Sequence, residues 1–152
     1  MPEKIIIDAS VVLKWIPGEK ETEVTQARKT YKLLKEKIIQ VIAPSFLLLE
    51  VSNILFKKRK ARVEIVSRAI QRLRACGIQY QDFRIDVVNE VIKLMSKYNI
   101  TAYDAIYLSL AKTHKAKLLT FDKELLKIRD LTIGIEEMLK NILVNKSISY
   151  GK

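Results

Sequence analysis

Short runs of aliphatic residues alternate along this chain with longer segments in which apolar residues recur at helical spacing. The first run, Lys4–Ile7, ends in three consecutive isoleucines, which is typical of a strand buried on both faces. Short apolar runs separated by helix-length segments indicate a parallel sheet covered by helices. With right-handed crossovers between the strands, the pattern predicts a three-layer α/β fold.

The same pattern predicts where each element lies. Strands are expected at Lys4–Ile7, Gln40–Ala43, Ile78–Phe83, Lys117–Thr120 and Leu131–Ile135. Helices are expected at Glu21–Lys37, Ser45–Lys58, Arg62–Ala75, Asp86–Tyr98, Ala102–Lys112 and, more briefly, Glu136–Val144. We therefore expect one domain over residues 1–144 and a flexible C-terminal tail over residues 145–152.

Charge is the most informative feature of the composition. The chain has 28 Lys and Arg residues against 17 Asp and Glu residues, which gives a net charge of +11 and favours polyanionic partners such as RNA. No apolar run approaches the roughly 18 residues of a membrane span, and the N-terminus has no secretory signal pattern. Cys76 is the only cysteine, so no internal disulfide is expected. A cytoplasmic protein without membrane contact is predicted.

Two of three candidate aspartates stand where functional groups of parallel sheets gather, beyond the carboxyl ends of the strands. Asp8 follows the first predicted strand and Asp122 the fourth, while Asp104 lies in the first turn of the helix that begins after Thr101. If the first and fourth strands are neighbours, Asp8 and Asp122 emerge side by side. Taken singly, each aspartate is explained equally well as a helix cap, with Thr101 and Asp104 forming a capping box.

Glu50 is harder to explain as a structural residue. It lies between Leu49 and Val51 on a helix whose apolar residues nearly encircle it. A carboxylate there is costly to desolvate unless a charged group meets it. Positions 46, 47, 53 and 54 supply no cation, so a partner must come from elsewhere in the chain.

Several carboxylates in one place predict a metal ion. Two of them about 4 Å apart repel by roughly 4 kcal/mol at an effective dielectric constant of about 20. A divalent ion removes this repulsion, and oxygen ligands favour Mg²⁺ or Mn²⁺ over Zn²⁺. A zinc site is not indicated, since His114 is the only histidine and its position near a helix end suits the helix dipole.

Four segments resemble, in order, the motifs of the PIN-domain family, in particular the virulence-associated protein C (VapC) type of toxin. They are Ile-Ile-Asp8-Ala-Ser10, Ala-Pro-Ser-Phe-Leu-Leu-Leu-Glu50-Val-Ser-Asn53, Thr101-Ala-Tyr-Asp104-Ala-Ile-Tyr-Leu-Ser-Leu-Ala and Leu-Leu-Thr120-Phe-Asp122-Lys-Glu-Leu. The likeness runs from about residue 4 to residue 126. One such segment would mean little, but four with sensible spacing make a specific signal.

The resemblance implies a PIN-like sheet of strand order 3-2-1-4-5 and a metal-dependent endoribonuclease. Asp8, Asp104 and Asp122 would bind Mg²⁺ or Mn²⁺, and Glu50 would complete the acidic pocket by orienting a metal-bound water. Such a metal supplies both water activation and charge neutralisation to phosphodiester cleavage. The extended chain after Ile135 departs from the short ending usual in the family.

Further site residues and partners follow from the same resemblance. Ser10 and Asn53 match polar positions that support the pocket, although ordinary polar capping explains them nearly as well. The family pattern also implies a homodimer that a small antitoxin protein holds inactive.

A basic run just past the Glu50 helix is the candidate RNA contact. It comprises Lys57, Lys58, Arg59 and Lys60, and a solvated helix end is the simpler explanation.

Two alternatives stay open: a PIN-domain RNA-processing factor, and a non-catalytic RNA-binding module in ribosome maturation. A haloacid-dehalogenase-like phosphatase is disfavoured, because it expects a second aspartate two residues after Asp8, where Ser10 stands.

Overall fold

A five-stranded parallel sheet forms the centre of the computed structural model, which describes residues 1–17 and 23–149. Its strand order is β3-β2-β1-β4-β5, and every neighbouring pair is parallel. The strands are β1 (Glu3–Ile7), β2 (Ile39–Pro44), β3 (Gln79–Gln81), β4 (Lys117–Leu119) and β5 (Thr132–Ile133). The predicted α/β class and strand order are confirmed.

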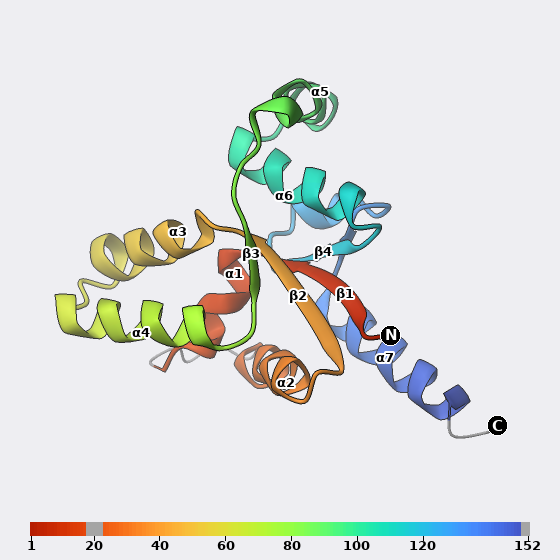
Figure 1. Ribbon diagram of the computed structural model, residues 1–152, viewed down its shortest axis with the longest axis horizontal. Coiled ribbons are helices and arrows are strands. Elements are labelled where there is room, and N and C mark those ends of the chain that lie inside the picture. Colours follow the sequence, from red (N-terminus) through yellow and green to blue (C-terminus); the bar gives the residue numbers. More distant parts are fainter. Residues whose placement is uncertain (18–22, 150–152) are drawn as a thin grey trace.

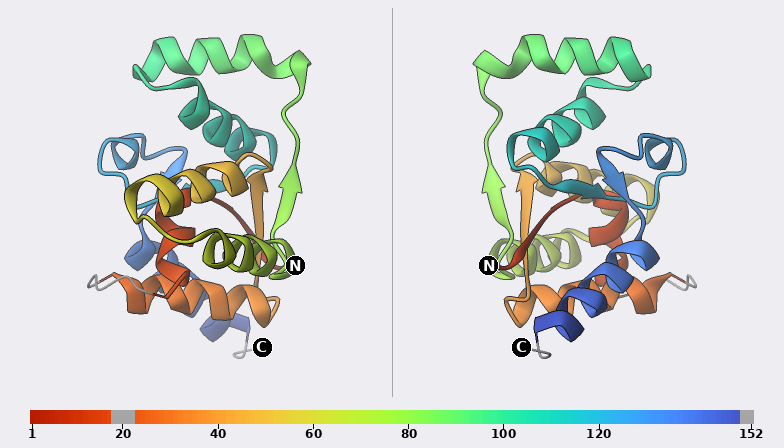
Figure 2. Two further views of the ribbon diagram at one scale, coloured as in Figure 1. Left: turned by 90° about the vertical axis from the view of Figure 1, so that its left-hand side faces the viewer. Right: turned by 90° about the vertical axis from the view of Figure 1, so that its right-hand side faces the viewer.

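Helices cover the sheet and fill the connections between its strands. They are α1 (Ala9–Val12), α2 (Val24–Lys35), α3 (Leu47–Asn53), α4 (Val63–Ala75), α5 (Val88–Tyr98), α6 (Ala102–Thr113) and α7 (Ile135–Ser149). In Figure 1, α3 and α4 lie side by side on the left, and α5 lies above α6 at the top. Figure 2 shows α3 and α4 across one side of the molecule and α7 across the other.

The core lies where the aliphatic strands meet these helices. Ile6, Ile42 and Leu118, one from each of the three central strands, are at most 1% exposed. Helix α6 packs against β1, β2 and β4, so its first turn is fixed relative to the ends of the central strands. The sheet and α6 together provide the frame on which the acidic residues are arranged.

The start of α6 is set by local backbone signals. Asn99 ends α5 in the left-handed conformation, with φ of 52°, which asparagine tolerates better than most residues. Thr101 then caps α6, and its hydroxyl accepts a hydrogen bond from the Asp104 amide at 3.2 Å. These two signals place Asp104 in the first turn of α6.

The largest departures from the predicted elements lie near the two ends of the chain and in the Glu50 helix. Helix α1 was not expected, and residues 21 and 22 of the first predicted helix lie outside the described residues. The helix predicted at Ser45–Lys58 is divided into α3 and a π-helical turn, Ile54–Lys58. Helix bounds elsewhere differ from the prediction by only a few residues.

The chain from residue 145, which was expected to form a flexible tail, is helical as far as Ser149, because α7 continues to that residue. Its first part is anchored by the buried Ile135, Met138 and Ile142, and the helix then extends beyond this contact. The rest of the expected tail, residues 150–152, lies outside the described residues. Over the described part of the chain, no helix has both the length and the apolar character needed to cross a membrane.

Candidate metal centre

A cavity of about 290 Å³ at the carboxyl ends of β1 and β4 collects all four predicted acids. It is lined by Asp8, Ala9, Ser10, Glu50, Asn53, Ile54, Asp104, Tyr107, Asp122 and Leu125. The two predicted supporting residues, Ser10 and Asn53, are therefore also at the cavity. Segments far apart in the sequence converge here because strand ends and helix starts meet at one edge of the sheet.

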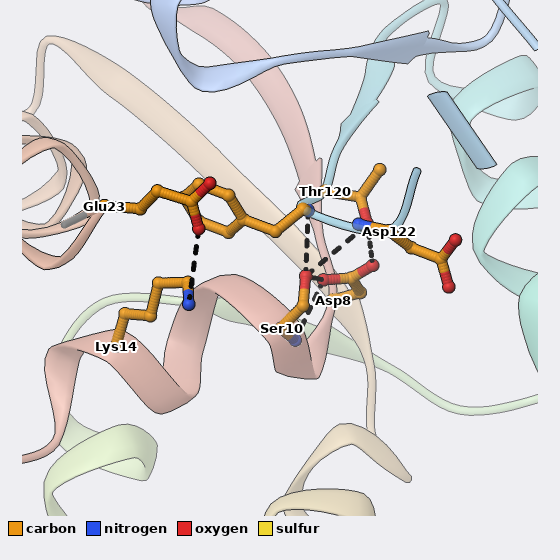
Figure 3. Close-up of polar contacts among 7 residues, drawn as sticks. Asp8, Ser10, Lys14, Glu23, Thr120 and Asp122 are labelled. Carbon is orange, nitrogen blue, oxygen red and sulfur yellow. Dashed lines mark hydrogen bonds and ion pairs between the residues drawn. The ribbon is translucent and has the colours of Figure 1, made fainter. Parts of the chain in front are cut away.

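Strand register brings Asp8 and Asp122 together. Ile7 of β1 pairs with Leu119 of β4, so Asp8 and Thr120 are the next residues on adjacent parallel strands. Asp122 follows two residues later. Figure 3 shows Asp8, Ser10, Thr120 and Asp122 converging where these strands end. Because β1 and β4 are neighbouring strands, Asp8 and Asp122 lie close together at their ends.

Two hydroxyl groups hold the Asp8 carboxylate. Ser10 donates to Oδ1 through its amide at 3.0 Å and its hydroxyl at 2.5 Å, and the Thr120 hydroxyl donates to Oδ2 at 2.5 Å. Each hydroxyl in turn accepts a backbone amide at 3.0 Å, Ser10 from Phe121 and Thr120 from Asp122. We call this arrangement the hydroxyl clamp. It ties Asp8 to the segment that carries Asp122 (Figure 3).

The side-chain partner of Glu50 is a neutral hydroxyl group. The Tyr107 hydroxyl donates to Glu50 Oε2 at 2.7 Å, and Tyr107 itself is only 2% exposed. Glu50 is half-buried, so its carboxylate keeps contact with solvent at the cavity. The partner does come from elsewhere in the chain, as the sequence indicated. A hydroxyl donor together with partial exposure is enough to make this position tolerable.

Asp8 is a helix cap, Asp122 accepts hydrogen bonds from nearby backbone amides, and neither role removes these residues from the cavity. Asp8 caps α1 through the Ser10 amide. Asp122 Oδ1 accepts bonds from the amides of Glu124 at 2.8 Å and Leu125 at 3.2 Å. A cap uses one or two lone pairs of a carboxylate, which leaves others to face the cavity.

Burial and mutual repulsion raise the pKa values of three of these acids. Burial raises the pKa of Asp8 even though the hydroxyl clamp opposes the change. Burial also raises the pKa of Glu50, and the charges of Asp8 and Asp104 add to the effect. The pKa of Asp104 is raised by burial and further by Asp122. The acids are thus close enough to influence one another electrostatically.

No lysine or arginine among the described residues lines the cavity to compensate this charge. Lys14, also drawn in Figure 3, is directed to Glu23, with Nζ 3.6 Å from Oε2. Four carboxylates, a serine hydroxyl and an amide oxygen instead make a donor set of hard oxygens, which fits Mg²⁺ or Mn²⁺. In the described part of the chain, however, no three Asp, Glu, His or Cys side chains are drawn together as a preformed ligand group.

Sequence reasoning missed two residues of the site. Thr120 was treated as the end of a strand, and Tyr107 was given no role in the site. Their hydroxyl groups bond carboxylates 112 and 57 residues away, respectively. The sequence signal for these two residues is their position near a predicted site residue. Thr120 stands two residues before Asp122, and Tyr107 stands one helical turn after Asp104.

The predicted RNA-contact run lies at the far end of the Glu50 helix and is not among the residues that line the cavity. Lys57 and Lys58 end the π-helical turn, and with Lys60 they are exposed, whereas Arg59 is half-buried. Their role in RNA binding stays a prediction.

Most of the chain, including all four acids of the cavity, matches a known protein family. The model of the PIN domain matches residues 5–131, close to the span over which the four motifs were found. The chain belongs to the PIN-domain family. The resemblance drawn from the motifs is confirmed at this level.

Known proteins similar to this PIN domain include a curated relative and solved structures. Ribonuclease VapC3 of Pyrobaculum aerophilum is 28% identical over 131 residues, which cover 80% of this chain and 92% of that protein. The crystal structure of PAE2754 from the same organism matches with a TM-score of 0.66 at 22% identity, covering 95% of this chain and 98% of that one. A toxin–antitoxin complex from Klebsiella pneumoniae contains a chain that matches with a TM-score of 0.62 at 18% identity, covering 85% and 96%. These structures share the fold of this PIN domain.

Proposed function

We propose that this PIN domain is a metal-dependent endoribonuclease and the toxin of a toxin–antitoxin pair. The observation that carries the proposal is the convergence of Asp8, Glu50, Asp104 and Asp122 on one cavity with no cationic side chain among its described lining residues. A relative 28% identical over most of both chains carries the name Ribonuclease VapC3. The non-catalytic alternative fits less well, because a pure binding module has no need of four carboxylates on one cavity, where the charges of Asp8 and Asp104 help to raise the pKa of Glu50 and the charge of Asp122 helps to raise that of Asp104.

Asp8, Asp104 and Asp122 would hold Mg²⁺ or Mn²⁺, either directly or through water. The bound ion would supply charge neutralisation at the scissile phosphate and acidify water. The carboxylates would have to close in around it, since they are not drawn together as a preformed group.

The chain's own residues have separate tasks in this scheme. The hydroxyl clamp keeps Asp8 in place as an ionised acceptor, because both hydroxyl protons are directed at its oxygens. Glu50 lies at the cavity with its raised pKa and accepts a proton from the attacking water. The acidic cavity repels RNA, so the net charge of +11, with Lys57, Lys58, Arg59 and Lys60 foremost, would guide the substrate.

The proposed partners are RNA, a small antitoxin protein and a second copy of the chain. A solved relative of similar fold was crystallised as a toxin–antitoxin complex. The acidic cavity would be the part of the molecule that an antitoxin must keep from RNA.

The proposal is tested with purified protein and single-stranded RNA. Internal cleavage is expected with Mg²⁺ or Mn²⁺, and EDTA should stop it. Identical cleavage in EDTA would contradict the metal role, and the absence of cleavage with either metal would contradict the nuclease assignment. Recovery of activity after readdition of Mn²⁺ excludes protein damage by the chelator.

A further inference from the structure

Tyr107 occupies an unusual place for a residue of the core. Its ring is buried on α6 and packs edge-on against Phe46, with ring centroids 5.5 Å apart. Its hydroxyl group nevertheless reaches the cavity, where it bonds Glu50 Oε2 at 2.7 Å. A buried ring fixes the direction of its hydroxyl, because the side chain has no other rotamer available in a packed interior.

The two oxygens of Glu50 therefore have different surroundings. Oε2 is held by Tyr107, whereas Oε1 has no hydrogen-bond or ion-pair partner among residues 1–17 and 23–149. Glu50 is half-buried, so Oε1 is left to the solvent of the cavity. One oxygen is anchored and the other is available for a proton or a ligand.

The anchor also links two elements of the site. Tyr107 is three residues after Asp104 on α6, so the two side chains share one face of that helix. Glu50 comes from a different element, α3, and lines the same cavity. The Tyr107 bond thus fixes Glu50 relative to the helix that carries Asp104.

We infer that Tyr107 is a positioning residue, which holds Glu50 Oε2 so that Oε1 faces the reacting water in the cavity. The inference rests on the proposed ribonuclease function and adds a residue to it. Without the hydroxyl, the Glu50 side chain would be free to rotate among its rotamers, and a misplaced base transfers a proton less often.

The protonation state of the Tyr107 hydroxyl also supports this role. Burial, and then the nearby Glu50 carboxylate, raise the pKa of Tyr107 far above its usual range, so the phenol keeps its proton. The hydroxyl therefore always donates and never competes with Glu50 as a base. A phenylalanine would fill the same space and remove only the hydrogen bond.

The test compares Tyr107→Phe with Tyr80→Phe. Tyr80 is a matched control, because its partly buried hydroxyl donates to the Leu73 carbonyl at 2.9 Å and does not line the cavity. Both variants lack one hydroxyl bond, so similar decreases in melting temperature are expected. Only Tyr107→Phe should lower kcat, by about 10–100-fold, as seen for outer-shell partners of active sites. The KM for RNA should be unchanged in both variants.

A double-mutant cycle shows whether Tyr107 acts through Glu50. In a Glu50→Ala background, measured under single-turnover conditions, Tyr107→Phe should have no further effect on the cleavage rate. Equal losses in both backgrounds, or a kcat of Tyr107→Phe equal to wild type, would overturn the positioning role and leave the nuclease proposal intact. A wild-type protein that cleaves no RNA with either metal would instead overturn the proposed function, and the positioning role with it.

Discussion

The two ends of the sheet carry cavities of different electrostatic character. At the carboxyl end, four acids meet with no basic side chain among the described lining residues. At the amino end, a cavity of about 420 Å³ is also rich in charged residues, but the two signs are mixed. Its lining includes the acids Glu3, Asp130 and Glu137 together with the lysines Lys4, Lys112, Lys115 and Lys117.

Two of the lysines that line the amino-end cavity have partners within the protein. Lys112 pairs with Glu90, and the Lys117 ammonium donates to the Arg129 carbonyl at 2.9 Å. At the carboxyl end the partners of the carboxylates are neutral hydroxyl and amide donors, and the pKa values of three acids are raised. This difference is the reason for proposing a cation at the carboxyl end and not at the amino end, and the proposal can be tested at both cavities.

The largest expected effect is on catalysis. Asp8→Asn or Asp104→Asn should lower the RNA cleavage rate by about 100-fold or more, because a metal ion contributes several kcal/mol to such a transition state. Asp130→Asn is the matched change at the amino-end cavity and should leave the rate unchanged. The test is to measure the cleavage rates of these variants at saturating RNA, and far-UV circular dichroism checks that each variant is folded. Full activity in both carboxyl-end variants would contradict the assignment.

Removing one hydroxyl of the clamp should have the next largest effect. Thr120→Val keeps the shape of the side chain and leaves Asp8 Oδ2 without its donor, so we expect about 10–100-fold lower activity. Loss of this buried bond should also cost about 1–3 kcal/mol of unfolding free energy. Thr30→Val is the control, because Thr30 is fully buried and its hydroxyl also donates to a carbonyl and accepts an indole N–H. Thr30→Val should lower the unfolding free energy by a similar amount and leave the RNA cleavage rate unchanged.

The raised pKa values predict an unusual dependence of stability on pH. Asp8, Glu50 and Asp104 bind protons more tightly in the folded protein than in the unfolded chain. Without divalent ions, the unfolding free energy contributed by these groups should therefore fall as pH rises from the ordinary values, 3.8 for Asp and 4.5 for Glu, through the raised folded values.

Mg²⁺ should reverse this loss of stability, by about 2.7 kcal/mol at a concentration 100 times its dissociation constant. Urea unfolding at several pH values, with and without Mg²⁺, measures both effects. In Asp8→Asn the pH dependence should be flatter and the Mg²⁺ effect smaller. A wild-type protein that Mg²⁺ does not stabilise near pH 7 would contradict the cation site.

The smallest effect concerns RNA binding by the basic run. Replacing Lys57, Lys58 and Lys60 with alanine should weaken binding and reduce the salt slope of log K by about 0.7 for each lysine that neutralises a phosphate. The control removes the same charge from the amino-end cavity through Lys4, Lys115 and Lys117. Equal slopes for the two triple variants would show that only net charge matters and would exclude a specific role of the basic run.

Much of this architecture could be predicted because it depends on local pattern. The isoleucines of β1 mark a strand buried on both faces, and the position of Asp8 after it indicates a functional edge. The order of the strands was implied by the family resemblance, and with that order the grouping of Asp8 and Asp122 follows from the rule that functional groups gather beyond the carboxyl ends of parallel strands. The end of α7 could not be predicted, because Asn145, Lys146 and Ser147 resemble a polar tail although they are helical.

The interactions that hold the acids in place were beyond local pattern. A hydroxyl residue gives no sign of which distant carboxylate it will bond, and Thr120 and Tyr107 find partners only through the tertiary fold. The bond between Glu50 and the Tyr107 hydroxyl could not be predicted for the same reason. Burial of α3 was overestimated at that position, where the side chain is half-buried at the cavity.

Crystals soaked in Mn²⁺ test the convergence of the acids on a cation most directly. We expect anomalous density in the carboxyl-end cavity, with Asp8, Asp104 and Asp122 coordinating the ion directly or through water, and none at the amino-end cavity. Density confined to the amino end, or none at either end at saturating Mn²⁺, would contradict the account.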